Sequence, residues 1–134
     1  MINLLIDTNI WIYVMDKSSV FNQPAKSILS NPDYNFFITS KNISEFFAVT
    51  SKRKISYESS SNYYEEIKNK AAILFPTERS LSILEKLIQQ YQPKGNQVFD
   101  MEIVSIMLDN EIKHIATFNR KDFSTINEVQ ILDT

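Results

Sequence analysis

The stretch Leu4-Leu5-Ile6-Asp7-Thr8-Asn9 decides the fold, because a fully apolar run ends there at an acid. An unbroken apolar run favours a short strand buried on both faces of a sheet, whereas a half-exposed strand would alternate apolar and polar residues. Apolar residues at helical spacing follow over 10–15, and Thr8 or Asn9 offers the side-chain oxygen that a helix N-cap requires. The stretch therefore predicts a strand, an acid at its carboxyl end and a helix.

The same strand-then-helix pattern recurs along the rest of the chain. Aromatic, β-branched or apolar runs predict further strands at residues 35–40, 73–75, 114–118 and 129–132. Apolar residues at helical spacing predict helices at about 25–29, around 46–49, and at 57–73, 78–91 and 101–111. Short strands that alternate with helices pair in parallel through helical crossovers, so the predicted fold class is α/β with a parallel sheet between helices.

The composition is that of an ordinary globular protein, with 43% hydrophobic and 22% charged residues. Its 134 residues match the usual size of one domain, and we expect a single domain over 1–134. The N-terminus carries no basic leader, and no apolar run approaches the roughly 20 residues that cross a bilayer. We therefore expect a cytoplasmic protein without a membrane segment.

The residues that the chain lacks exclude several kinds of chemistry. With no cysteine, disulfides, thiol nucleophiles and cysteine-bound zinc are excluded. One histidine, His114, cannot supply a two-histidine zinc site, and one glycine, Gly95, cannot supply a glycine-rich phosphate loop. The formal net charge of −2 provides no general attraction to nucleic acid, so binding of a polyanion would require a local basic patch or a metal ion.

Oxygen-bearing side chains stand at or soon after the ends of the predicted strands, where open parallel sheets bind their ligands. They are Asp7, Glu45, Asp100, Asn119 and Asp122. Several carboxylates that meet without basic partners would repel one another, and a divalent cation removes that conflict. Because hard oxygen donors favour hard cations, the expected ion is Mg²⁺ or Mn²⁺.

Each acid also has a purely structural interpretation. Asp7 is suited to cap the first helix, and Asp100 is suited to cap a helix that begins at Met101. Glu45 follows Asn42 by three residues, which is the spacing of a capping box. No single position decides between a helix cap and a metal ligand.

The order of these short segments adds information that no single segment carries. Leu-Leu-Ile-Asp7-Thr8-Asn9 is followed by Ser44-Glu45-Phe46, by Asp100 at the head of a helix and by residues 117–123. In this order they resemble the PIN-domain family and, within it, the VapC-type toxins of type II toxin–antitoxin pairs. The resemblance covers nearly the whole chain, and it implies a three-layer fold with a central sheet of about five parallel strands.

The resemblance also implies a function. Asp7, Glu45 and Asp100 would hold Mg²⁺ or Mn²⁺, and the activity would be endonucleolytic cleavage of RNA. The cleavage would use a metal-activated water, so no side-chain nucleophile is needed. A cognate antitoxin would be the protein partner, and the chain is compatible with a homodimer.

The sequence departs from the family pattern at Asn119, where many relatives carry a fourth Asp. An amide oxygen coordinates metals but brings no negative charge. Asp122 is the alternative fourth ligand or else a turn residue; we favour Asn119, because it follows the strand that ends at Phe118. Thr8 and Thr117 are expected to support the acids through hydrogen bonds.

A local basic patch would help an acidic chain to bind RNA. Its candidates are Lys52, Arg53, Lys94, Arg120 and Lys121. Each of them is equally compatible with an ordinary solvated surface residue.

Two other functions remain open from the sequence. One is a catalytically silent PIN-like module that binds RNA or protein, which Asn119 slightly favours. The other is a receiver-like Mg²⁺-binding signalling domain, which the sequence disfavours because Leu4–Ile6 contain no acid. His114 opens a predicted strand and Trp11 lies on an apolar helical face, so both are interpreted as structural residues.

Overall fold

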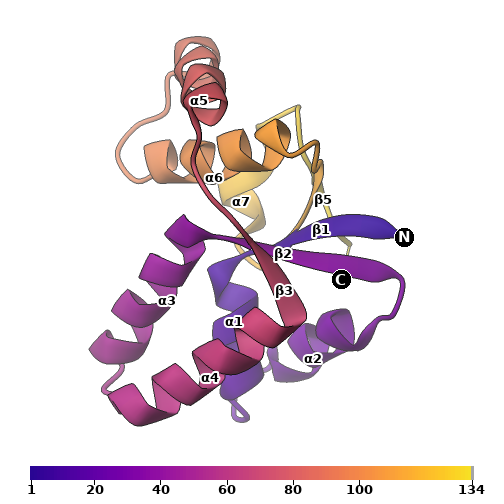
Figure 1. The fold of residues 1–134 in the computed structure, drawn as a ribbon, viewed down its shortest axis with the longest axis vertical. Helices are drawn as coiled ribbons and strands as arrows, with labels where there is room; N and C mark the ends of the chain where they lie inside the picture. Colours follow the sequence, from indigo (N-terminus) through magenta and orange to yellow (C-terminus); the bar gives the residue numbers. More distant parts are fainter. Residues whose placement is uncertain (134) are drawn as a thin grey trace.

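Residues 1–133 are described by a computed structural model, and their strands form one parallel sheet (Figure 1). Within this range the sheet has five strands in the order β3-β2-β1-β4-β5, and every neighbouring pair is parallel. The strands are β1 (Ile2–Ile6), β2 (Tyr34–Thr39), β3 (Ala71–Leu74), β4 (His114–Ala116) and β5 (Gln130–Ile131). The predicted α/β class and the central parallel sheet are confirmed.

The helices cover the two faces of the sheet. They are α1 (Thr8–Met15), α2 (Asn22–Ser30), α3 (Ser40–Lys52), α4 (Tyr57–Lys70), α5 (Glu78–Tyr91), α6 (Gln97–Asp109) and α7 (Arg120–Phe123). Figure 1 shows α1 to α4 below the sheet and α5 to α7 above it, so the molecule has three layers. In the part of the chain that the structure describes, no helix is long and apolar enough to cross a membrane.

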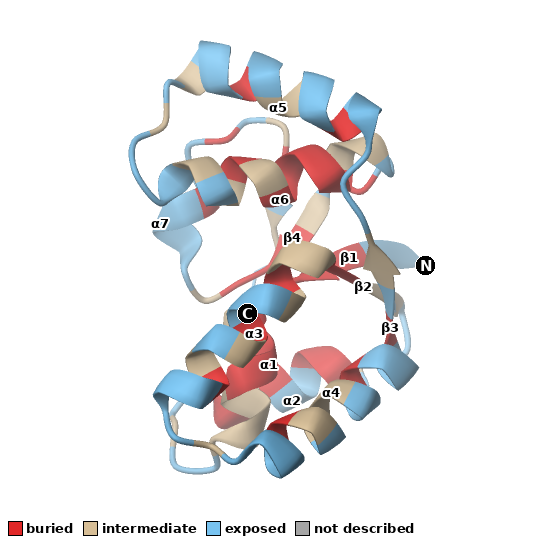
Figure 2. Cartoon of the chain, turned by 60° about the vertical axis from the view of Figure 1, so that its left-hand side comes forward, coloured by how far each residue is buried: buried red, intermediate tan, exposed pale blue. Residues whose placement is uncertain are grey.

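The unbroken apolar run of β1 is explained by a separate hydrophobic core on each face of the sheet. Leu4 and Ile6 pack into the core formed with α1 to α4. Leu5, between them, packs into the core formed with α5 to α7. All three side chains are fully buried, as the red centre of the sheet in Figure 2 shows. Each such burial contributes roughly 1.5–3 kcal/mol to folding, which is why this strand cannot alternate with polar residues.

Several element boundaries differ from those predicted, and two of the differences have a clear physical cause. Helix α4 ends at Lys70 and β3 occupies Ala71–Leu74, because Ala71 pairs with Phe36 of β2 and is drawn into the sheet. Helix α6 begins at Gln97, four residues before the predicted start at Met101. Its first turn carries polar and exposed side chains, so apolar periodicity could not reveal it.

Candidate active site

The candidate site lies at the carboxyl edge of the sheet. Because β1 and β2 are parallel neighbours, their ends deliver Asp7 and Thr39 to the same edge. Each of these residues is also the N-cap of the helix that follows, α1 or α3. At this edge the chain passes from β1 into α1 and from β2 into α3, so the polar groups of two helix N-termini lie there.

Asp7 is held in a fixed orientation by neighbouring polar groups. Its side chain is only 6% exposed. Oδ1 accepts hydrogen bonds from the backbone N–H of Thr8 at 2.8 Å and from Asn42 Nδ2 at 3.3 Å. Oδ2 accepts hydrogen bonds from Thr117 Oγ1 at 2.8 Å and from Asn9 Nδ2 at 3.1 Å. Burial raises the pKa of Asp7 above its usual value, while the hydrogen bonds from Thr117, Thr8 and Asn9 oppose that rise.

Thr117 links Asp7 to the chain that leaves β4. Its hydroxyl donates to Asp7 and accepts from Asn9 Nδ2 at 3.1 Å and from the backbone N–H of Asn119 at 3.0 Å. The next backbone N–H, of Phe118, donates to Asn9 Oδ1 at 3.1 Å. Since these two backbone N–H groups donate to the side chains of Asn9 and Thr117, they do not continue the sheet, and β4 ends at Ala116, two residues before the predicted end.

Three further carboxylates line a hollow of about 530 Å³ at this edge, and they come from three helices. Glu45 lies on α3, Asp100 in the first turn of α6 and Asp122 on α7. Burial, the largest cause, and the charges of Asp122, Asp7 and Glu45 together raise the pKa of Asp100 to about 7. Burial also raises the pKa of Glu45, together with the charges of Asp7 and Asp122, while Lys41 opposes the rise. The four acids therefore form one electrostatically coupled group.

The structure places Asp122 and Asn119 differently. Asp122 lines the acidic hollow, and its charge raises the pKa of Asp7, Glu45 and Asp100. Asn119 lines a smaller hollow of about 160 Å³, which also borders Glu45. Both residues are therefore near the acids, but Asp122 is the one that adds charge to them.

The structure corrects two of the capping interpretations. The capping box of α3 consists of Thr39 and Asn42, so Glu45 has no part in it and extends to the hollow. The N-cap of α6 is Asn96, which leaves Asp100 inside the first turn and not at the cap. Asp7, in contrast, is both the N-cap of α1 and part of the coupled acids. Cap and site are not exclusive roles at this position.

Sequence reasoning missed Asn9 and Asn42 as parts of the site. Asn42 is fully buried, and its Nδ2 donates to Thr8 Oγ1 at 3.1 Å as well as to Asp7. The available signal was the spacing of Thr39 and Asn42, three residues apart directly after a strand, which marks a helix start. Nothing in the local sequence indicates that Asn42, 35 residues away, contacts Asp7.

The oxygen donors of the site fit a hard divalent cation, but the carboxylates are not gathered closely around one point. Across residues 1–133, no three His, Cys, Asp or Glu side chains are grouped closely enough to hold a metal ion. Coulombic coupling between charges acts over several ångströms, whereas metal–oxygen bonds span about 2.0–2.6 Å, so coupled acids need not be a preformed site. The excess of carboxylates, with Asp100 protonated up to near neutral pH, is the feature that a cation would stabilise.

The predicted basic residues are distributed unevenly around the acids. Lys94 lines the acidic hollow, and Arg53 lines the smaller one and lies 3.8 Å from Asp16. Arg120 is directed toward the chain end, 3.3 Å from Asp133. Lys52 and Lys121 are exposed surface residues that line neither hollow.

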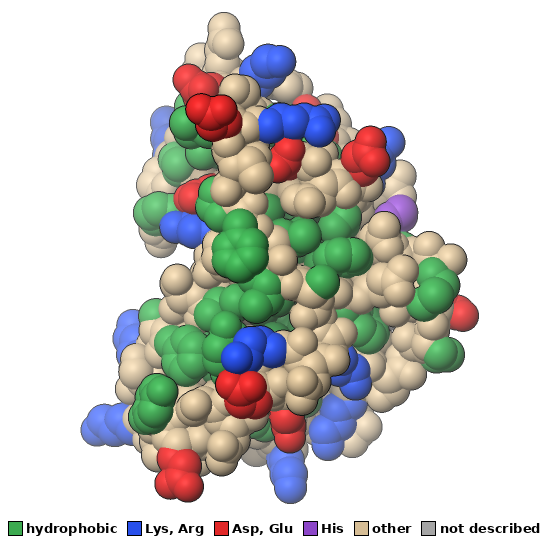
Figure 3. Space-filling view, viewed as in Figure 1, with side chains coloured by type: hydrophobic (Ala, Val, Ile, Leu, Met, Phe, Trp, Pro, Cys, Tyr) green, Lys and Arg blue, Asp and Glu red, His purple; other side chains and the backbone are tan. Residues whose placement is uncertain are grey.

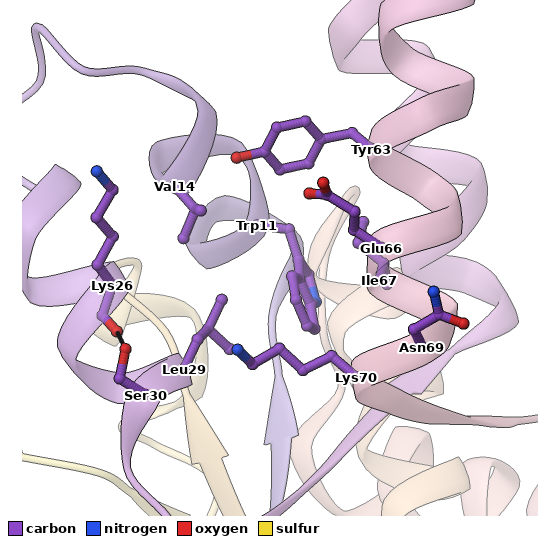
Figure 4. Close-up of a pocket in the computed structure, with 10 residues that line it drawn as sticks. All are labelled: Trp11, Val14, Lys26, Leu29, Ser30, Tyr63, Glu66, Ile67, Asn69 and Lys70. Atoms are coloured by element: carbon purple, nitrogen blue, oxygen red, sulfur yellow. Dashed lines mark hydrogen bonds between the residues drawn. The ribbon is translucent and has the colours of Figure 1, made fainter.

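A third hollow, the apolar pocket, has a volume of about 480 Å³ and lies between α1, α2 and α4 (Figure 4). Trp11, Leu29 and Ile67 form its apolar floor, and Lys26 and Lys70 stand at its edge. Trp11 is 2% exposed, as its interpretation as a core residue requires. Its buried Nε1 has no hydrogen-bond partner among the described residues. This pocket contains none of the coupled acids.

Comparisons with known proteins agree with this architecture. The sequence model of the PIN domain family matches residues 4–129, so the chain belongs to the PIN domain family. No curated protein matches the chain in sequence.

Several solved structures share the fold. One is a chain of VapBC2 from Rickettsia felis, solved bound to a DNA fragment from its promoter. It is 19% identical to this chain with a TM-score of 0.74, and the match covers 99% of each chain. A chain of VapBC-1 from nontypeable Haemophilus influenzae is 24% identical with a TM-score of 0.72 and 98% coverage of each chain. VapC20 of Mycobacterium tuberculosis, described as a Sarcin-Ricin loop cleaving toxin, is 14% identical with a TM-score of 0.72 and covers 95% of this chain and 98% of its own.

Proposed function

We propose that this protein is an endoribonuclease dependent on Mg²⁺ or Mn²⁺, and that it is the toxin of a toxin–antitoxin pair. The observation that carries the proposal is the group of four coupled carboxylates at the carboxyl edge of the sheet, with the pKa of Asp100 raised to about 7. Such a concentration of negative charge is costly without a cation, and clefts of this kind are typical of catalytic sites. VapC20, a structural relative, is described as a Sarcin-Ricin loop cleaving toxin.

The proposed roles follow from the contacts of each residue. Asp7 and Asp100 would hold the ion, with Glu45 and Asp122 completing the negative charge around it. A bound divalent ion lowers the pKa of a coordinated water and offsets the negative charge of a phosphodiester. Four hydrogen bonds, two to each oxygen, hold the Asp7 carboxylate in place, so an ion that binds Asp7 would have to replace at least one of them.

The proposed partners are RNA, a cognate antitoxin and a second copy of the chain, all in the cytoplasm. The antitoxin is supported by relatives that were solved as VapBC complexes. The homodimer is supported by exposed apolar side chains, among them Phe75 and Leu81. Figure 3 shows apolar side chains gathered across the middle of one face, in the region of β3 in Figure 1. Sedimentation at several concentrations tests the dimer, and a concentration-independent monomer would contradict it.

Cleavage of total RNA tests the activity. We expect fragments with Mg²⁺ or Mn²⁺ and none with EDTA or with the Asp100→Asn variant. Cleavage that persists in EDTA would contradict the metal requirement, and wild-type protein that binds RNA without cutting it would favour the catalytically silent module. The spacing of the acids keeps that alternative open. The receiver-like alternative is set aside, because the chain belongs to the PIN domain family.

A further inference from the structure

Phe99 is an exposed aromatic side chain in a polar and charged hollow. It lies in the first turn of α6, directly before Asp100, and is 53% exposed. It lines the acidic hollow together with Glu45, Asp100 and Asp122. Among the exposed large apolar side chains of residues 1–133, Phe99 is the one that lines this hollow. A ring that stays half exposed beside charged groups adds less to folding than a buried one, and it is available to contact a ligand.

Lys41, in the first turn of α3, contacts the Phe99 ring. Its Nζ lies 4.9 Å from the ring centroid and 3.4 Å from Glu102 Oε1. The first turns of α3 and α6 are thereby bridged through a cation–π contact and an ion pair. The positive charge of Lys41 also opposes the raised pKa of Glu45. Lys41 is therefore close to both the Phe99 ring and Glu45, and a phosphate bound beside the ring would lie near its positive charge.

Two amide side chains also line the acidic hollow. Asn96 and Gln97 line it beside Lys94. Gln97 Oε1 accepts a hydrogen bond from the backbone N–H of Lys94 at 2.9 Å, which leaves the Gln97 amide hydrogens to donate elsewhere. Amide side chains match the donors and acceptors on base edges, and a lysine matches the phosphate backbone. An aromatic platform, amides and lysines together are the groups that hold an unpaired nucleotide.

We propose that Phe99 is the stacking platform for one unpaired base of the RNA, next to the phosphodiester that is cut. This inference rests on the proposed ribonuclease function and deepens it by naming the residue that positions the base beside the cleaved bond. A base can stack on Phe99 only when it has left its own helix, because a paired base keeps both faces covered. Lys41 and Lys94 then face the backbone of the same strand.

Binding of a fluorescently labelled single-stranded oligoribonucleotide tests the platform independently of cleavage. The titration is done with Ca²⁺, an oxygen-binding cation with looser geometry than Mg²⁺. We expect Phe99→Leu to weaken binding roughly 5- to 100-fold, the loss that aromatic stacking platforms show on truncation. Phe99→Trp should bind within about threefold of wild type, because its ring still stacks.

The matched control is Tyr57→Ala, which removes an exposed aromatic from α4, outside the acidic hollow. It should bind RNA as wild type does. Equal binding by wild type and Phe99→Leu would overturn the platform. A loss of RNA binding in Phe99→Leu that Phe99→Trp does not restore would also overturn it. A change in sedimentation without a change in RNA binding would overturn it too, because it would assign Phe99 to a protein interface.

Cleavage kinetics with Mg²⁺ separate this inference from the proposed function. Phe99→Leu should raise KM for a single-stranded substrate and blur the choice of cleavage site, while kcat changes less. If wild type binds RNA through Phe99 and never cuts it, the enzymatic proposal fails and the platform stands. If wild type cuts RNA and Phe99→Leu cuts it with the same KM and sites, the platform fails and the enzyme stands.

Discussion

Two hollows of similar volume, about 530 and 480 Å³, differ in almost every chemical respect. The acidic hollow is bordered by the first turn of α6 and by side chains of α3 and α7, and burial together with nearby carboxylates raises the pKa of Asp100 and of Glu45. The apolar pocket is floored by Trp11 and Ile67, which also belong to the core below the sheet (Figure 4). Side chains in the first hollow oppose folding when they are charged, whereas those in the second stabilise it. The comparison teaches that activity and stability should be separable by mutation.

The largest expected effect is the loss of cleavage in Asp100→Asn. Removing this carboxylate should lower the rate by roughly 1000-fold or more, because a metal ion supplies several kcal/mol of transition-state stabilisation. The melting temperature should stay the same or rise, since one repelling charge is gone. Gel assays and thermal melts of the same preparation provide both measurements. An active variant, or one that melts well below wild type, would make Asp100 a structural residue.

The apolar pocket should behave in the opposite way. Trp11→Ala should destabilise the fold by about 3–5 kcal/mol, the range for a large core residue, because Trp11 is only 2% exposed. Cleavage at a temperature where the variant stays folded should remain near wild type. Trp11→Phe is the milder control, since it removes an Nε1 donor that has no partner among residues 1–133. Denaturant unfolding measures all three proteins, and a catalytic loss in folded Trp11→Ala would break the separation.

Asp122 and Asn119 sharpen the comparison within the acidic edge. The structure leads us to expect that Asp122→Ala lowers the rate roughly 10- to 100-fold, because its charge acts on all three other acids. Asn119→Ala should cost less, since Asn119 borders the smaller hollow. Rates of both variants with saturating Mn²⁺ decide the order. The reverse ranking would restore Asn119 as the fourth ligand, as its place directly after Phe118 first suggested.

The smallest expected effect is a pH dependence of stability in EDTA. The folded state raises the pKa of Asp100 from 3.8 to about 7, so ionising this group favours the unfolded chain. The contribution of Asp100 to the free energy of unfolding should therefore be greatest below about pH 4 and should fall as the pH rises toward 7. After allowance for solvent screening the loss is on the order of 1 kcal/mol. Urea midpoints against pH should be flatter in Asp100→Asn, and parallel curves for the two proteins would contradict the coupling.

Much of the architecture was predictable because its causes are local. The helix over Glu78–Tyr91 matches its predicted bounds, since its apolar face and its Thr77 cap both lie within the segment. The start of α6 was missed because its first turn faces the hollow and shows no apolar period. The capping roles of Glu45 and Asp100 were misjudged for a related reason, because spacing alone does not show which of two nearby polar residues the backbone uses.

By itself, the sequence determined the class of fold and the edge at which the acids lie. Apolar runs such as Leu4–Ile6 must be buried, and parallel strands present their following residues at one edge, so Asp7 was placed by the local pattern. Only the tertiary structure decided which groups contact Asp7. Thr117 and Asn42 lie 110 and 35 positions away, and they reach Asp7 because β4 and β2 flank β1. The same fold brings Phe99 and Lys41 together from helices on opposite sides of the sheet, a contact that residue spacing alone does not reveal.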